Sequence, residues 1–205
     1  NGTLATMGTK VMPGDTVMVH HTTITPCQKE YLLAFHKPAG IVCTTSKIDK
    51  NNVIDYLNFP ERIYPVGRLD KESTGLLLLT NNGQLMDDIL RGSNYHEKEY
   101  IVHVNKPITD SVLQAMAQGV PILDTITRPC KIRRMGKDCF YITLTQGLNQ
   151  IRRMCEYFDY RVTSLKRIRI MNIELGSLPV GKWRELTPSE IKTLKNLAQN
   201  KGEAE

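Results

Sequence analysis

Asp70 stands in the segment PVGRLDKESTGLLLLTNNG (residues 65–83), between one apolar stretch and a second that starts at Thr74-Gly75. Both stretches favour strands, so the carboxylate is predicted at a strand–loop junction, held rigidly but open to a ligand. Carboxylates are among the side chains that form covalent intermediates in enzymes. Arg68, two residues earlier, can neutralise a phosphate. The alternative, favoured when GRLD is taken alone, is a turn aspartate bonded to its own backbone.

Tyr100 and Lys98 lie in a second segment, HEKEYIVHV (residues 96–104), whose composition favours a strand. A spacing of two residues places both side chains on the same face of that strand. The ordinary outcome for such a tyrosine is a position in the core with its hydroxyl hydrogen-bonded.

Arg152 and Arg153 fall in the first turn of a helix predicted within TQGLNQIRRMC (residues 145–155). Positive side chains are mildly unfavourable beside the positive end of the helix dipole, so an anionic partner would stabilise them. A pair of solvated arginines is an equally good interpretation.

Short strands and helices alternate around these three segments. Strands are expected in residues 16–20, 31–40, 63–69, 75–80, 99–104, 139–145, 162–165 and 168–175. Helices are expected in residues 53–57, 84–90, 112–117, 150–158 and 188–198, with Asp110 and Thr187 capping the third and the fifth. A turn is predicted in residues 12–15 (MPGD) and a linker in residues 21–26. The predicted fold class is α+β, with a mixed, largely antiparallel sheet and flanking helices.

Composition and charge narrow the class of protein. A chain of 205 residues can hold one sizeable domain, or one domain and a small appendage, and it has no apolar run of membrane-spanning length. The five cysteines form no CxxC pair and lack ligand spacing with histidine, so we expect reduced thiols and no metal. The net charge is +6, and eleven basic residues between Arg128 and Arg169 face only three acidic ones. This excess favours binding to a phosphate backbone, although a solvated surface would have the same composition.

The segments GRLDKESTGLLLLTNNG, KEY and QIRRM together resemble the pseudouridine synthases of the RsuA/RluB/RluE/RluF family. The RluF type is the most similar, through HEKEYIVHVNKPIT, GVPIL, QIRRMCEYFDY and RIRIMNIELGSLPVGKWRELT. The resemblance covers essentially the whole chain. It implies the pseudouridine synthase fold and isomerisation of a specific uridine in 23S ribosomal RNA, and also in a transfer RNA. A cytoplasmic, monomeric enzyme without cofactor, metal or membrane partner is expected.

The resemblance also implies roles for single residues. Asp70 takes the place of the nucleophile, Tyr100 that of the tyrosine stacked on the uracil and proposed to take the C5 proton, and Arg152 that of the basic partner of the aspartate. RNA contacts are implied for Arg68, Leu69, Lys71, Lys98, Gln150, Ile151 and Arg153. The chain departs from the family at one point. Asn149 is followed directly by Gln150, where the family has an extra residue, and this would shift the approach of the helix.

The implied chemistry suits these residue types. Breaking the N1–C1′ bond, turning the base and rejoining it through C5 needs an ionised carboxylate, which Arg152 would favour, and an aromatic wall for the base. The target uridine must also leave its stack. Attack on the sugar, attack on the base and assisted elimination all remain open.

The first residues, NGTLATMGTKVMPGDTVMV, resemble the last hairpin of an S4 RNA-binding module, whose two leading helices would precede residue 1. We therefore expect residues 1–25 to be a remnant of such a module with a linker, and residues 26–205 to be the catalytic domain.

Two other functions fit parts of the pattern. A non-catalytic RNA-binding or ribosome-assembly protein would use the basic face without needing the aspartate, tyrosine and arginine. A glycosidase-like hydrolase would need a second carboxylate, for which Glu72, Glu97 and Glu99 are available. Catalysis by Asp70 requires its carboxylate to lie within about 4 Å of Arg152, with Arg153 as the substitute, and in one cleft with Tyr100.

Overall fold

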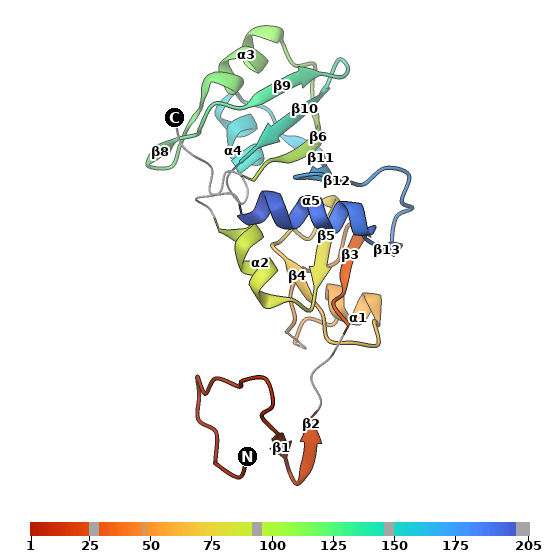
Figure 1. Ribbon diagram of the computed structural model, residues 1–205. Coiled ribbons are helices and arrows are strands. Elements are labelled where there is room, and N and C mark those ends of the chain that lie inside the picture. Colours follow the sequence, from red (N-terminus) through yellow and green to blue (C-terminus); the bar gives the residue numbers. More distant parts are fainter. Residues whose placement is uncertain (25–28, 47, 92–95, 146–149, 200–205) are drawn as a thin grey trace. The chain divides into compact units, whose positions relative to one another are not determined.

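The protein is described by a computed structural model in residues 1–24, 29–46, 48–91, 96–145 and 150–199 (Figure 1). Its contacts divide the chain into two units, Asn1–Glu30 and Tyr31–Glu205. In the described residues, no helix is both long enough and apolar enough to cross a membrane.

The first unit contains an antiparallel hairpin of β1 (Val17–Val19) and β2 (Thr22–Ile24). Its turn lies at His20 and His21, which both have positive φ. The predicted linker is therefore partly a strand, and the turn that connects the pair follows β1 instead of preceding it. The sequence signal was weak because two-residue hairpin turns usually carry Asn or Gly at the positions with positive φ.

The second unit is built on one mixed sheet, to which the described residues contribute nine strands in the order β13-β3-β5-β11-β6-β10-β9, with β4 beside β5 and β12 beside β11. The strands are β3 (Leu32–Lys37), β4 (Tyr64–Val66), β5 (Thr74–Thr80), β6 (Lys98–Val104), β9 (Lys131–Arg134), β10 (Cys139–Leu144), β11 (Val162–Ile170), β12 (Ile173–Glu174) and β13 (Trp183–Glu185). A separate ladder joins β7 (Pro121–Ile122) and β8 (Thr125–Ile126). Within the described part of the large sheet, β5 and β11 are parallel and the other strand pairs are antiparallel, as predicted for the fold class.

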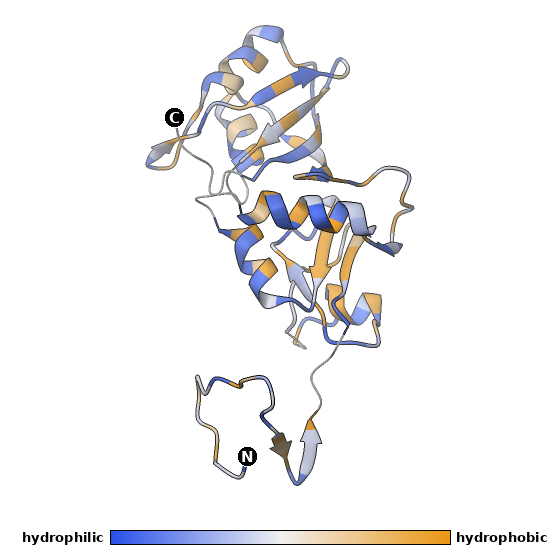
Figure 2. Ribbon diagram, in the orientation of Figure 1, coloured by the Kyte–Doolittle hydropathy of each residue, from blue (hydrophilic) through white to orange (hydrophobic). Residues whose placement is uncertain are grey.

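Helices cover both faces of this sheet. They are α1 (Val53–Leu57), α2 (Gly83–Leu90), α3 (Asp110–Gln118), α4 (Gln150–Tyr157) and α5 (Pro188–Gln199). The apolar residues of α1, α3 and α4 join one core cluster, and those of α2 and α5 join the other. Alternate residues of β3 and β5 belong to the two clusters, so residues 32–35 of β3 and 76–79 of β5 form continuous apolar runs (Figure 2). The run of four leucines at residues 76–79 is continuous for this reason.

Several predicted elements differ in detail. The cap of α3 is Thr109, whose hydroxyl accepts from the amide of Val112, and Asp110 is the first helical residue instead. The two strands expected in residues 162–175 are a long β11, interrupted by bulges, and a short β12. The predicted cap of α5 is confirmed, because Thr187 and Glu190 exchange hydrogen bonds in a capping box.

The parallel pair of β5 and β11 is short, with two register pairs, Thr74 with Lys166 and Gly75 with Arg167. Gly75 has φ +108°, and a Cβ there would lie 2.6 Å from the amide nitrogen of Arg167 and overlap its carbonyl oxygen. Only glycine lets the two backbones approach this closely. Gly75 thus joins the half of the sheet containing β3 and β5 to the half containing β6, β9, β10 and β11.

We expect Gly75→Ala to lower the free energy of unfolding by roughly 2–5 kcal/mol, from backbone strain and from overlap with Arg167. Gly83→Ala is the matched control, since Gly83 begins α2 with open space around its Cβ position. That change should be neutral or stabilise by up to about 1 kcal/mol. Urea denaturation measures both variants, and equal stabilities would contradict this account of the junction.

Candidate active site

A cavity of about 290 Å³ lies at the junction of β5 and β11, near the lower end of the range for small-ligand sites. Most of its wall is apolar, and polar groups converge on it from four parts of the chain. It is lined by Val66, Gly67, Arg68, Leu69, Asp70, Ser73, Ile89, Leu90, Lys98, Tyr100, Gln150, Ile151, Leu165, Arg167 and Ile170.

Asp70 enters the cavity from the loop between β4 and β5, and buried Lys37 supports that loop. The Lys37 side chain is fully buried, and its ammonium donates to the carbonyls of Pro38 (2.8 Å), Lys71 (3.1 Å) and Ser73 (2.9 Å). The amide of Ser73 donates in turn to the carbonyl of Asp70, at 3.1 Å. Burial lowers the pKa of Lys37, so these carbonyls compensate a cation that has lost its hydration. Lys37 was not predicted from the sequence; its only signal was a lysine at the end of an apolar strand segment.

Arg152 reaches Asp70 from the first turn of α4. Its Nε lies 3.5 Å from Oδ2 of Asp70, and its Nη2 lies 3.5 Å from the hydroxyl of Ser73. The two charged side chains are 29% and 31% exposed, which leaves them accessible to a substrate. The distance between Arg152 and Asp70 is within the limit of about 4 Å that the catalytic hypothesis required. An ion pair this exposed contributes at most about 1 kcal/mol to stability, so its main effect is on the charge of the site.

Tyr100 and Lys98 contribute the wall formed by β6. Tyr100 is 9% exposed, and it pairs directly with Arg167 of β11. Lys98 lies on the same face two residues earlier, and its ammonium donates to the carbonyl of His96 at 3.2 Å. Burial, and then the positive charge of Arg167, lower the pKa of Lys98 to about 8.

Arg167 is a site residue that the sequence indicated only as one of the eleven basic residues between Arg128 and Arg169. It is 3% exposed, and its Nε donates to the carbonyl of Leu76 at 2.7 Å. A bulge between Arg167 and Arg169 pairs these residues with Tyr100 and Glu99, which are adjacent on β6. The two arginines therefore face opposite sides of the sheet, whereas an unbroken strand would place them on the same side.

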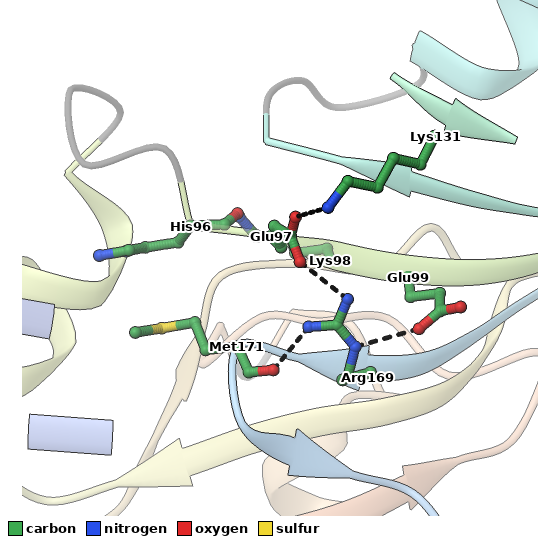
Figure 3. Close-up of polar contacts among 7 residues, drawn as sticks. All are labelled: His96, Glu97, Lys98, Glu99, Lys131, Arg169 and Met171. Carbon is green, nitrogen blue, oxygen red and sulfur yellow. Dashed lines mark hydrogen bonds and ion pairs between the residues drawn. The ribbon is translucent and has the colours of Figure 1, made fainter. Parts of the chain in front are cut away.

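Arg169 holds a network of ion pairs on the other side of β6 (Figure 3). Its guanidinium binds Glu97 and Glu99 at 3.0 Å each, and Lys131 binds Glu97 at 3.1 Å. Burial alone would raise the pKa of Glu97, but the hydrogen bonds from Arg169 and Lys131 outweigh burial and lower it. These cations are thus neutralised within the protein, and the predicted RNA-facing basic surface does not include all eleven residues.

Most of the predicted site residues meet in the cavity. Its lining includes Asp70, Tyr100, Arg68, Leu69, Lys98, Gln150 and Ile151, and Arg152 contacts Asp70 at its edge. Lys71 and Arg153 are exposed and do not line it. The question of an extra residue before Gln150 falls on residues 146–149, outside the described residues. Among the residues that the structure describes, Asp70 is the one carboxylate that lines the cavity, which removes the support for a two-carboxylate hydrolase.

One group of described residues has the donor set for a metal ion, although none of its members lines the cavity. His103, Asp138 and Cys139 present ligand atoms within 4.8 Å of one another, where β6 pairs with β10. The cavity itself offers an aromatic ring, one carboxylate and several cations, a set that suits an organic anion or a nucleobase better than a metal.

Known proteins are similar to this chain in sequence and in fold. The model of the RNA pseudouridylate synthase family matches residues 31–157. The dual-specificity RNA pseudouridine synthase RluF of Escherichia coli (strain K12) is 50% identical over 203 residues, covering 98% of this chain and 70% of that protein. The ribosomal large subunit pseudouridine synthase B of Bacillus subtilis (strain 168) is 33% identical over 211 residues, covering 98% of this chain and 86% of that protein.

A crystal structure of a pseudouridylate synthase is also similar, with a TM-score of 0.76 at 28% identity, covering 91% of this chain and 83% of that one. The family and the fold class predicted from the sequence are thereby confirmed. The similarity to pseudouridine synthases extends over nearly the whole chain, in sequence and in fold. It therefore supports the catalytic function over the alternative of a non-catalytic RNA-binding protein. The chain belongs to the RNA pseudouridylate synthase family and is an isomerase that forms pseudouridine in RNA.

Proposed function

We propose that this enzyme isomerises a specific uridine of large-subunit (23S) ribosomal RNA, and also a uridine of a transfer RNA, as a monomer in the cytoplasm. The names of its relatives support these targets, since one is a dual-specificity RNA enzyme and the other acts on the large ribosomal subunit. The observation that carries the proposal is the convergence of Asp70, Tyr100 and Arg152, which come from distant parts of the chain, at one cavity.

Asp70 is the proposed nucleophile, and Arg152 orients its carboxylate through their ion pair. Tyr100 forms the wall against which the uracil rests while it is detached from the sugar. The base must leave its stack to enter a cavity of this size, and the apolar walls then separate it from water. The reaction rejoins the same two fragments, so a concave site that retains the free base suits it.

The other predicted RNA contacts divide into two sets. Arg68, Leu69, Lys98, Gln150 and Ile151 line the cavity and would contact the target nucleotide. Lys71 and Arg153 are exposed outside it and would bind the flanking phosphates. Residues 1–25 are proposed to be the end of an S4-like module, which would add RNA contacts of its own.

We expect Asp70→Asn to reduce pseudouridine formation by roughly 10³-fold or more, because the amide cannot replace a carboxylate nucleophile. Asp124→Asn, at an exposed turn between β7 and β8, is the matched control and should remain active. Tritium release from C5-labelled RNA measures the rate.

Mapping pseudouridine in 23S and transfer RNA from a deletion strain, complemented with either variant, identifies the target. Turnover by the Asn variant would refute the role of Asp70, and unchanged maps in the deletion strain would refute the proposed targets.

Lys98 predicts a pH dependence. A lysine with a pKa of about 8 carries its positive charge below that pH and loses it above. If this charge helps to hold the RNA, kcat/KM should fall as the pH rises through about 8. Lys98→Arg stays charged, so its fall should move above pH 9. Identical profiles of the two proteins between pH 6.5 and 9.5 would show that Lys98 does not contribute charge to binding.

The exposed part of the basic region is expected to bind phosphates. Replacing Arg153 and Arg161 with Glu should flatten the dependence of log Kd on log salt by about 0.7–0.9 for each lost contact. Lys192→Glu makes the same kind of charge change at an exposed position of α5 and serves as the control. An equal slope in the double variant and the control would mean that these arginines are only solvated.

A further inference from the structure

Arg167 is a buried cation whose hydrogen bonding is incomplete. Its Nε and Nη1 donate to the main-chain carbonyls of Leu76 (2.7 Å) and Arg68 (3.4 Å). Its Nη2 is buried and has no hydrogen-bond partner among the described residues. In that part of the chain the guanidinium also forms no ion pair with a carboxylate, since both of its acceptors are neutral.

Such an arrangement is unfavourable for a folded protein. A buried donor without an acceptor, and a buried charge without a partner, each destabilise a fold, so native proteins rarely keep them without a reason. Arg169 gives the contrast within the same strand, because its guanidinium binds two carboxylates and a carbonyl. Carboxylate partners are thus available to an arginine of this strand. The side chain of Arg167 lies in the cavity instead, away from those carboxylates.

The surroundings of Arg167 indicate which kind of ligand could accept a hydrogen bond from its Nη2. It lines the cavity together with Asp70 and pairs directly with Tyr100, so it lies beside the proposed position of the uracil. Much of the wall is apolar, and its other charged side chains besides Asp70 are the cations Arg68 and Lys98. A uracil ring offers two carbonyl oxygens as acceptors, and either could receive the unused N–H. An anionic form of the ring would also compensate the charge.

We infer that Arg167 is a further catalytic residue, whose unused N–H donates to a carbonyl oxygen of the target uracil and stabilises the uracil anion. The inference rests on the proposed function of the cavity. When the N1–C1′ bond breaks, both electrons remain on N1, and the negative charge is shared among N1, O2 and O4. The sugar is held meanwhile either as an ester between C1′ and the Asp70 carboxylate, or as a glycal once its C2′ proton has passed to that carboxylate. C5 of the turned base then bonds to C1′ as the ester C–O bond breaks, or as the C2′ proton returns to the glycal. The C5 proton finally leaves to a base, and N1 takes up a proton.

A hydrogen bond to this anion would grow stronger as the N1–C1′ bond lengthens, so it would lower the barrier more than it tightens ground-state binding. The prediction is therefore that Arg167→Gln and Arg167→Lys reduce the single-turnover rate by about 10- to 100-fold, with a much smaller change in RNA affinity. Arg169→Gln is the matched control on the same strand and should keep a near-normal rate on the folded fraction of the enzyme.

A cycle of protein and substrate changes separates catalysis from a structural role. The substrate is an RNA fragment that the wild-type enzyme modifies, prepared with uridine, 2-thiouridine or 4-thiouridine at the target position. Sulfur accepts hydrogen bonds poorly, so the thio group at the contacted carbonyl should slow the wild type about 10-fold or more. The same substitution should slow Arg167→Gln by less than about 3-fold, because the bond is already lost. The control variant should retain the wild-type sensitivity.

Equal thio effects in the wild type and in Arg167→Gln would assign Arg167 a structural role and overturn the inference. If neither Arg167 variant folds, the wild type still decides the matter, because indifference to both thio substitutions would exclude the contact. Failure of the proposed function has a different signature. In that case the wild type would form no pseudouridine, or Asp70→Asn would remain active, whatever the thio substrates show.

Discussion

The close approach of Gly75 to Arg167 connects β5 with β11 and so determines where the active site can form. Pairing between these two strands is restricted to two residue pairs, and it joins the two halves of the sheet. Asp70 comes from the loop just before β5, and Tyr100 lies directly opposite Arg167 on β6. A side chain at Gly75 would separate the halves and move the carboxylate away from the tyrosine.

Charges are distributed unequally on the two sides of β6 and β11. On one side, Arg169 and Lys131 are matched by Glu97 and Glu99, so that side is stabilised internally. On the cavity side, the cations Arg68, Lys98 and Arg167 share the wall with Asp70, the one carboxylate among the lining residues that the structure describes. A positive cavity accommodates a developing anion, and this property suits the exchange of a glycosidic bond. Lys37 adds rigidity beneath the loop that carries Asp70.

The elements best predicted from the sequence are those with a strong apolar pattern. β5, β6, β10 and the helices α2, α4 and α5 were expected close to their observed bounds. The strands β9 and β13 were missed, and both lie at edges of the sheet. β9 is the charged run Lys131–Arg134, and charged side chains are common on edge strands, where they discourage pairing between molecules. Nothing in such a segment signals a strand until its partner is in place.

The sequence by itself determined the family, the α+β class, and Asp70, Tyr100 and Arg152 as the residues to test. Motifs of this kind are defined by residue types and their order, so they can be recognised before any contact is known. Tertiary structure decided what lies around them. The bulge in β11 turns Arg167 toward the cavity and Arg169 away from it, and burial makes Lys37 a support of the loop. The period of two along a strand is a local property. A bulge depends on the register with a neighbouring strand from a distant part of the chain, and so it leaves no pattern that can be read along the sequence.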